Sequence, residues 1–159
     1  MEIGNFKSER ISRTASFIVR ASIEQAFLLF DAFEERKWEL GWDPQLIYPD
    51  KEIIEEGTTF KIINKPGEGF EPEYLWIVIQ FDSKIHLIQY LVSTPNRFWT
   101  ITVKCESINK SQTKASITYA YTGLNDLGNE LNKKSLEQMY RNNLKDWEQA
   151  INRYLEIIL

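Results

Sequence analysis

The chain has 159 residues and a formal net charge of −4 at neutral pH. These values favour one domain over residues 1–159 and argue against nucleic-acid binding, which usually requires a basic stripe that neutralises phosphates. Hydrophobic residues make up 43% of the chain and aromatic residues 13%. That share is enough for a sizeable core or for the walls of a ligand cavity.

The sequence gives no sign of export or of membrane insertion. Its first residues, MEIGNFKSERISR, are charged and lack the apolar centre of a secretory signal. The longest apolar run, residues 75–79, is too short to cross a bilayer. Cys105 is the single cysteine, so no intramolecular disulfide can form. We expect a cytoplasmic location and no integral membrane association; the oligomeric state is not readable.

The N-terminal part predicts a strand followed by two short helices. Residues 11–19 alternate between apolar and polar, which is typical of a strand. Ser22 and Gln25 have the spacing of a capping box, so we expect a helix at about 22–33. A shorter helix is predicted at 34–39, where a Gly and a Pro follow and end it.

The middle of the chain predicts a series of strands connected by short turns. We place them at 45–48, 51–55, 58–64, 73–82, 84–93, 97–109 and 113–123. In the last two the apolar and polar residues alternate most regularly, as in an antiparallel sheet that is covered on one face. Turns rich in Asp, Asn and Ser between them favour a meander.

The last third of the chain predicts one long amphipathic helix from about 135 to 158. Apolar residues recur there at the spacing of a single helical stripe, at 136, 140, 144, 147, 151, 154, 155 and 158. Leu127 and Leu131 fall out of phase, so either Gly128 marks a bend or the first turn packs elsewhere. The predicted fold is α+β, with a curved antiparallel sheet of six or seven strands, two short helices after the first strand and a long C-terminal helix packed on the sheet.

Two stretches carry a resemblance to a known superfamily. The strand ending FIVRA that runs into SIEQAF, and the long closing helix with Trp147, resemble the START-like (SRPBCC) superfamily, which has the helix-grip or birch-pollen-allergen-like fold. A narrower similarity, to uncharacterised bacterial polyketide-cyclase-like members, rests on WELGWDP (38–44), GTTF (57–60) and the stretch from Tyr119 to Asn129.

The resemblance implies a cavity between sheet and closing helix that holds a hydrophobic small-molecule ligand, such as a lipid, sterol, polyketide or plant hormone. It carries over no catalytic residue and implies no cofactor. The superfamily also contains cyclases, dehydratases and activators of a chaperone ATPase, so the fold alone does not choose among these functions.

Catalytic and metal chemistry have little support in the sequence. His86 is the single histidine; on its predicted strand it shares a face with Ile88 and Tyr90, which offer no carboxylate to orient a catalytic base. One His and one Cys cannot form a three-ligand zinc site. Cys105 is expected to be an inert buried thiol, and neighbouring acids such as Glu34 and Glu35 to be solvated. We predict no metal.

The candidate ligand-binding residues are mostly aromatic and are expected on the apolar faces. They are Trp38, Trp76, Tyr90, Trp99, Tyr119, Tyr121, Met139, Tyr140, Asn143 and Trp147. Asn143 shares a helix side with Met139 and Trp147, so its amide either touches water at the edge of the stripe or bonds a ligand. Residues 64–73 contain two Gly and two Pro, and we expect them to form a flexible lid near the cavity mouth.

Three hypotheses on function remain open. The first is binding of an apolar or amphipathic small molecule. The second is a cyclase or dehydratase in which Tyr119, Tyr121 or His86 polarises a carbonyl group. The third is a module that binds another protein, which predicts a filled interior and an exposed apolar patch.

Overall fold

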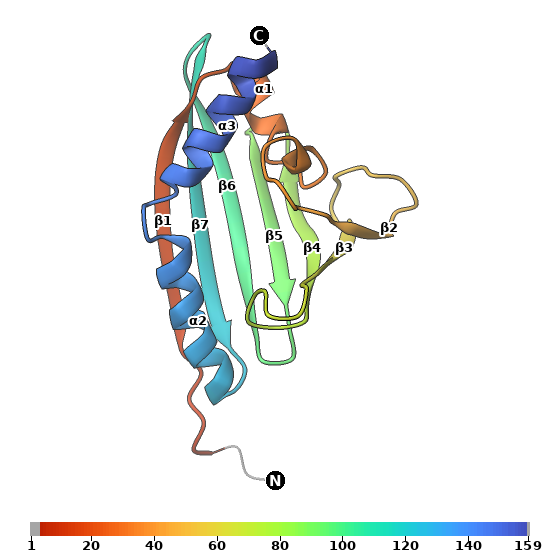
Figure 1. The fold of residues 1–159 in the computed structure, drawn as a ribbon, viewed down its shortest axis with the longest axis vertical. Helices are drawn as coiled ribbons and strands as arrows, with labels where there is room; N and C mark the ends of the chain where they lie inside the picture. Colours follow the sequence, from red (N-terminus) through yellow and green to blue (C-terminus); the bar gives the residue numbers. More distant parts are fainter. Residues whose placement is uncertain (1–3, 159) are drawn as a thin grey trace.

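The computed structural model describes residues 4–158. They fold into one curved sheet of seven antiparallel strands, with helices along one face (Figure 1). The strands are β1 (Arg10–Val19), β2 (Gln45–Tyr48), β3 (Thr59–Ile63), β4 (Glu73–Asp82), β5 (Leu87–Ser93), β6 (Arg97–Asn109) and β7 (Gln112–Gly123). Their order across the sheet is β1-β7-β6-β5-β4-β3-β2. The predicted α+β fold with a meandering sheet is confirmed.

The helices all come from the two ends of the sequence. They are α1 (Ile23–Leu28), the 3-10 helix η1 (Glu34–Lys37), α2 (Asp126–Met139) and α3 (Lys145–Ile158). Figure 1 shows α2 and α3 following one another along β1 and β7, with a bend between them. The helices lie over the sheet face on which the predicted apolar alternation of β6 and β7 is buried.

The first helix is shorter than the predicted 22–33. Ser22 caps it as expected, since its hydroxyl accepts the backbone N–H of Gln25 at 3.3 Å. The Asp31 carboxylate then accepts the backbone N–H groups of Phe33 and Glu34, at 2.8 and 3.4 Å. A short polar side chain that bonds its own backbone competes with helical hydrogen bonds, so the chain turns here and restarts as η1.

The predicted strand at 51–55 is wrong. This segment pairs with no strand; the Thr58 hydroxyl instead donates to the Ile53 carbonyl at 2.8 Å and accepts the Glu55 N–H at 3.0 Å. Thr58 is fully buried and Ile54 is 7% exposed. The apolar residues that suggested a strand are therefore explained by a folded loop that buries Ile54 against the core.

The strand predicted at 84–93 begins later, at Leu87. The Asp82 carboxylate accepts the N–H of Lys84 at 2.9 Å and of Ile85 at 3.3 Å, which closes a turn over these residues. His86 belongs to this turn and has a φ of 55°. The histidine thus lies outside the strand in which the sequence placed it.

The predicted long C-terminal helix is divided in two. Tyr140 ends α2, and its buried hydroxyl donates to the Ile117 carbonyl at 2.9 Å and accepts the Tyr119 N–H at 3.1 Å. Asn143 and Leu144 follow with φ of 55° and 62°, left-handed values that no helix tolerates. Leu144 is fully buried there. The tyrosine holds the chain against β7, and the turn lets α3 begin in a new direction.

Side chains of α3 bond the free edge of β1. The Asn152 amide donates to the Ile18 carbonyl at 2.9 Å and accepts the Arg20 N–H at 2.8 Å. The Glu148 carboxylate accepts the Ile18 N–H at 2.9 Å. These contacts fix α3 along β1, on the side that has no neighbouring strand.

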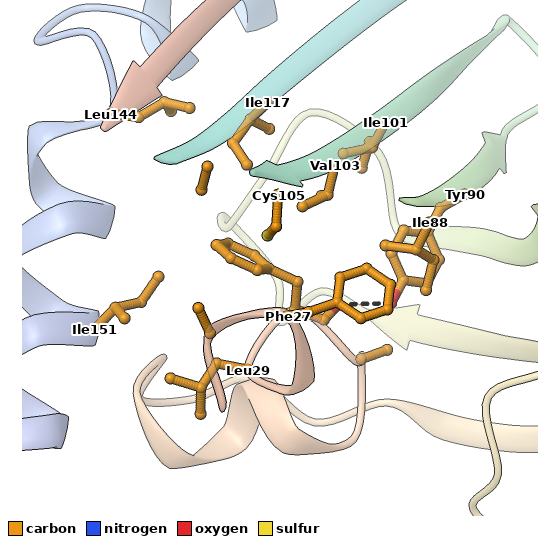
Figure 2. Packing of buried hydrophobic residues seen from close by; sticks show 14 of the residues in the cluster. Phe27, Leu29, Ile88, Tyr90, Ile101, Val103, Cys105, Ile117, Leu144 and Ile151 are labelled. Carbon is orange, nitrogen blue, oxygen red and sulfur yellow. Dashed lines mark hydrogen bonds between the residues drawn. The ribbon is translucent and has the colours of Figure 1, made fainter. Parts of the chain in front are cut away.

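The main apolar core lies at the α1 end of the sheet. Figure 2 shows Phe27 facing side chains of the central strands such as Val103 and Cys105, with Leu29 and Ile151 of α3 to one side. The Tyr90 hydroxyl donates to the Phe30 carbonyl at 2.8 Å across this region. This core borders a cavity that lies farther along the sheet, since Phe30 and Tyr90 belong to both.

One alternative from the sequence was a bend at Gly128. The structure shows instead that Gly128 allows the helix backbone to approach another loop closely. It lies in the first turn of α2, where a Cβ would come within 1.8 Å of the Asn96 carbonyl oxygen in the loop between β5 and β6. Asn125 caps the helix by accepting the Gly128 N–H at 2.8 Å. A glycine is therefore required for α2 to pack on this loop.

We expect Gly128→Ala to lower the free energy of unfolding by about 3 kcal/mol, because the backbone must move apart to admit one methyl group. Denaturant unfolding followed by circular dichroism measures the effect. Lys134→Ala, on the exposed side of the same helix, serves as the control and should change stability by less than about 0.5 kcal/mol. Equal stability of the glycine variant and the wild type would contradict the packing argument.

Candidate ligand pocket

A cavity of about 530 Å³ lies between the apolar face of the sheet and the segments that cover it. This volume falls within the range of roughly 300–1,000 Å³ that is typical of small-molecule sites. The sheet contributes aromatic and branched side chains, α2 and α3 contribute one wall, and two loops complete the lining with Leu40, Gly41, Trp42, Asn64, Gly69 and Phe70.

Seven of the ten predicted ligand-binding residues line this cavity. They are Trp76, Tyr90, Trp99, Tyr119, Tyr121, Met139 and Trp147. The register of the sheet explains why the strand residues meet, since Trp99 lies opposite Tyr121 and Ile101 lies opposite Tyr119. Contact of these side chains with a ligand stays a prediction.

Trp38 and Tyr140 do not line the cavity but support its wall from behind. The Trp38 indole N–H donates to the Leu29 carbonyl at 2.7 Å, and its ring lies 5.6 Å from that of Trp147. The Tyr140 ring lies 6.0 Å from that of Tyr119 in an edge-on arrangement. Both residues are core positions that hold a cavity-lining aromatic ring in place.

Asn143 requires a correction, because its amide does not point into the cavity. It lies in the exposed turn between α2 and α3, and its side-chain oxygen accepts a hydrogen bond from the Arg13 guanidinium at 2.9 Å. Extrapolating one helix through 140–144 caused the misplacement. Asparagine suits this position because it tolerates a positive φ better than most residues.

Asn143→Leu should therefore lower stability by about 1 kcal/mol, since a branched side chain is strained at φ 55° and the bond to Arg13 is lost. Affinity for a ligand of the cavity should stay unchanged. Thermal unfolding and titration with a fluorescent apolar probe measure the two quantities. Asn143→Gly, which suits the backbone but also loses the bond, separates strain from hydrogen bonding.

The aromatic lining carries polar atoms that have no protein partner. The Trp76 indole N–H is buried without a hydrogen bond from any described residue. Burial raises the pKa of both Tyr119 and Tyr121 above the usual value, and no hydrogen bond within the described chain contributes to either shift. Both hydroxyls therefore stay protonated and are available as donors to a bound molecule.

Glu35 and Glu39 are further lining residues, and the sequence did not identify them. Glu35 was expected to be solvated, but burial among aromatic residues raises its pKa to about 8, and the nearby Glu39 adds to the rise. The pKa of Glu39 is raised by burial and by Asp146, which also lines the cavity. Glu35, Glu39 and Trp42 are spaced as on one side of a helix, and this spacing could have placed Glu35 beside Trp42. From the sequence, Glu35 was instead grouped with its neighbour Glu34 as a solvated acidic pair.

Because the pKa of Glu35 is about 8 when folded and near 4.5 when unfolded, stability should fall as the pH rises between these values. In that range the folded chain keeps a proton that the unfolded chain releases. Glu35→Gln should therefore be more stable than the wild type by up to about 3 kcal/mol at pH 7, and equally stable at pH 4.

Thermal melts at pH 4, 6 and 8 check this prediction about Glu35. Glu24→Gln, which removes an exposed carboxylate from α1, is the matched control and should show no such dependence on pH. A difference between wild type and Glu35→Gln that does not change with pH would show that the carboxyl titrates normally.

The segment 64–73, predicted to be a lid, lies where it was expected, against the cavity. Asn64, Gly69 and Phe70 line the space, and Phe70 is 41% exposed. The segment is also tied down, because the Asn64 side chain donates to the Glu71 carbonyl at 2.7 Å. Its flexibility stays a prediction.

His86 and Cys105 take no part in the cavity lining. The His86 and Phe27 rings are perpendicular to one another, with 5.5 Å between ring centres. Cys105 is 1% exposed, and burial raises the pKa of its thiol to about 12. Within residues 4–158 no three His, Cys, Asp or Glu side chains are grouped to hold a metal ion, and no described helix has the length and apolarity needed to cross a bilayer.

Comparisons with known proteins support the fold. No family model and no curated protein matches the chain. A point mutant of norcoclaurine synthase from Thalictrum flavum, solved with a transition-state analogue, is similar with a TM-score of 0.72 and 17% identity, over 98% of this chain and 100% of that one. A protein from Thermus thermophilus has a TM-score of 0.67 and 10% identity, over 93% and 99% of the two chains.

A third similar structure is that of Ara h 8.0201, with a TM-score of 0.63 and 14% identity, over 94% of this chain and 99% of that one. All of these similarities cover nearly the whole of both chains. At such low identity they establish the architecture and nothing further. The chain has the helix-grip fold, as its resemblance to START-like proteins implied.

Proposed function

We propose that the protein binds an apolar or amphipathic small molecule, such as a lipid or a polyketide, in the cavity between the sheet and helices α2 and α3. The observation that carries this proposal is the cavity of about 530 Å³ with aromatic walls. Small-molecule sites combine such walls with a few polar groups that orient the ligand. Here the hydroxyls of Tyr119 and Tyr121 and the carboxyl of Glu35 supply those groups.

The two alternatives have less support. A module that binds another protein was expected to have a filled interior, which does not fit a cavity of this size. For the enzyme alternative, His86 lies outside the lining, and the pocket tyrosines are as well suited to orienting a ligand as to polarising a carbonyl. The similar point mutant of norcoclaurine synthase was solved in complex with a transition-state analogue, which is one example of a small molecule bound to a protein of this fold.

A cavity-filling substitution tests the proposal. Ile101 lines the cavity from β6 and is 3% exposed, whereas its neighbour Thr100 points to the opposite face. We expect Ile101→Phe to weaken binding of the neutral probe N-phenyl-1-naphthylamine by about ten-fold or more, because the added ring occupies the ligand's space. Thr100→Phe, the matched control, should bind the probe as the wild type does.

Probe fluorescence gives the affinity, and native mass spectrometry of the purified protein reveals molecules that it retains. Met139→Trp fills the cavity from α2 and replaces Ile101→Phe if the latter does not fold. Failure of the wild type to bind the probe saturably, or equal binding by the filled variants, would overturn the proposal.

A further inference from the structure

Glu35 is an unpaired acid in an aromatic cavity. The backbone of η1 fixes its position, since its N–H donates to the Asp31 carbonyl at 2.9 Å and its own carbonyl accepts the N–H groups of Trp38 and Glu39 at 3.1 and 2.9 Å. No hydrogen bond or cation within the described chain stabilises its carboxylate form. A carboxyl in this setting is costly for the fold, so its presence points to a partner that arrives from outside.

The charges around Glu35 define what that partner is. Glu39 and Asp146 line the same cavity, so this part of the wall is acidic. Arg97 is the cation in the described lining, but it is bound by Glu71 at 2.8 Å and by Ser135 at 2.7 Å. It does not contribute to the pKa of either Glu35 or Glu39. The acidic wall therefore lacks a positive charge.

We propose that the ligand of this cavity carries a protonated amine on an aromatic or other apolar body, and that the Glu35 carboxylate pairs with the amine. This inference rests on the proposed function, since it names the ligand class for the same cavity. An ammonium group donates a charge-assisted hydrogen bond to the Glu35 carboxylate. It also gains attraction to the faces of rings such as Trp76 and Trp147, whereas a ligand carboxylate would be repelled.

Binding of an amine requires a proton to leave. In the empty cavity Glu35 holds a proton at neutral pH, and the ligand enters as an ammonium ion. Glu35 releases its proton to solvent as the ion pair forms, so about one proton appears per amine bound. Affinity should rise from pH 6 to pH 8 and fall again as the amine loses its own proton at about pH 10.

Other ionisable groups face the same space and bound this pH effect. In the lining they are Glu39, Asp146, Arg97 and the tyrosines of the sheet, and Glu35 contributes to the raised pKa of Tyr90 and Tyr119. Asp31 lies outside the lining but also contributes to the raised pKa of Tyr90. Substitution of Glu35 itself is therefore needed to assign the released proton.

Three molecules with one naphthyl body and different head groups provide the test. They are 2-(1-naphthyl)ethylamine, 2-(1-naphthyl)ethanol and 1-naphthylacetate, titrated calorimetrically at pH 7. We expect the amine to bind about ten-fold more tightly than the alcohol, the size of one charge-assisted hydrogen bond, and the carboxylate to bind most weakly. Titrations in two buffers of different ionisation enthalpy count the released protons.

Glu35→Gln should remove the preference for the amine and the proton release, while binding of the alcohol stays within about two-fold of the wild type. Glu24→Gln, an exposed acid outside the cavity, should keep both. Equal or tighter binding of the alcohol or the carboxylate, or an amine preference that survives Glu35→Gln, would overturn the inference while the proposed function stands. If neither these molecules nor N-phenyl-1-naphthylamine, whose nitrogen is not basic, binds to the wild type, both proposals fail.

Discussion

The buried ion pair between Arg97 and Glu71 is the contact at which three parts of the chain meet. Arg97 is 1% exposed and Glu71 8%, and the two are 2.8 Å apart. Burial of two charges is unfavourable unless they gain hydrogen bonds, and here the Arg97 Nη1 also donates to Asn132 and Ser135 of α2, at 3.4 and 2.7 Å. Its charge also lies 4.7 Å from the centre of the Trp99 ring. The start of β6, the segment 64–73 and α2 are thereby fixed together at one end of the pocket.

Hydrophobic patterning predicted the sheet well and the helices less well, for a physical reason. Strands 45–48, 73–82 and 97–109 coincide with the observed bounds. In 97–109 the apolar alternation directly reports which face is buried. The stripe from Leu136 to Ile158 also reports burial, but it continues through the turn at 140–144 because Tyr140 and Leu144 remain buried there. Periodicity records which residues face the core; it does not record whether the backbone between them stays helical.

The aromatic lining could be predicted from the sequence, whereas its polar groups could not. Rings such as Trp99 and Tyr121 alternate on strands, so their shared face follows from the register. Glu35 belongs to a 3-10 turn after α1, and only the tertiary fold brings this turn against the sheet. Acids on a short polar helix are usually solvated, and Glu34 beside it pairs with Lys37 in the ordinary way. The burial of Glu35 can be recognised only when the residues that surround it in the folded chain are known.

The contacts between α3 and β1 affect how the protein behaves at high concentration. An edge strand of ten residues with free backbone groups is a template for pairing with another chain. Asn152 and Glu148 occupy the backbone groups of Ile18 and Arg20 along that edge. At the opposite edge, β2 is four residues long and its pairing with β3 shifts register. The C-terminal end of β1 and the short, irregular β2 thus offer few free backbone groups for the addition of a strand from another chain.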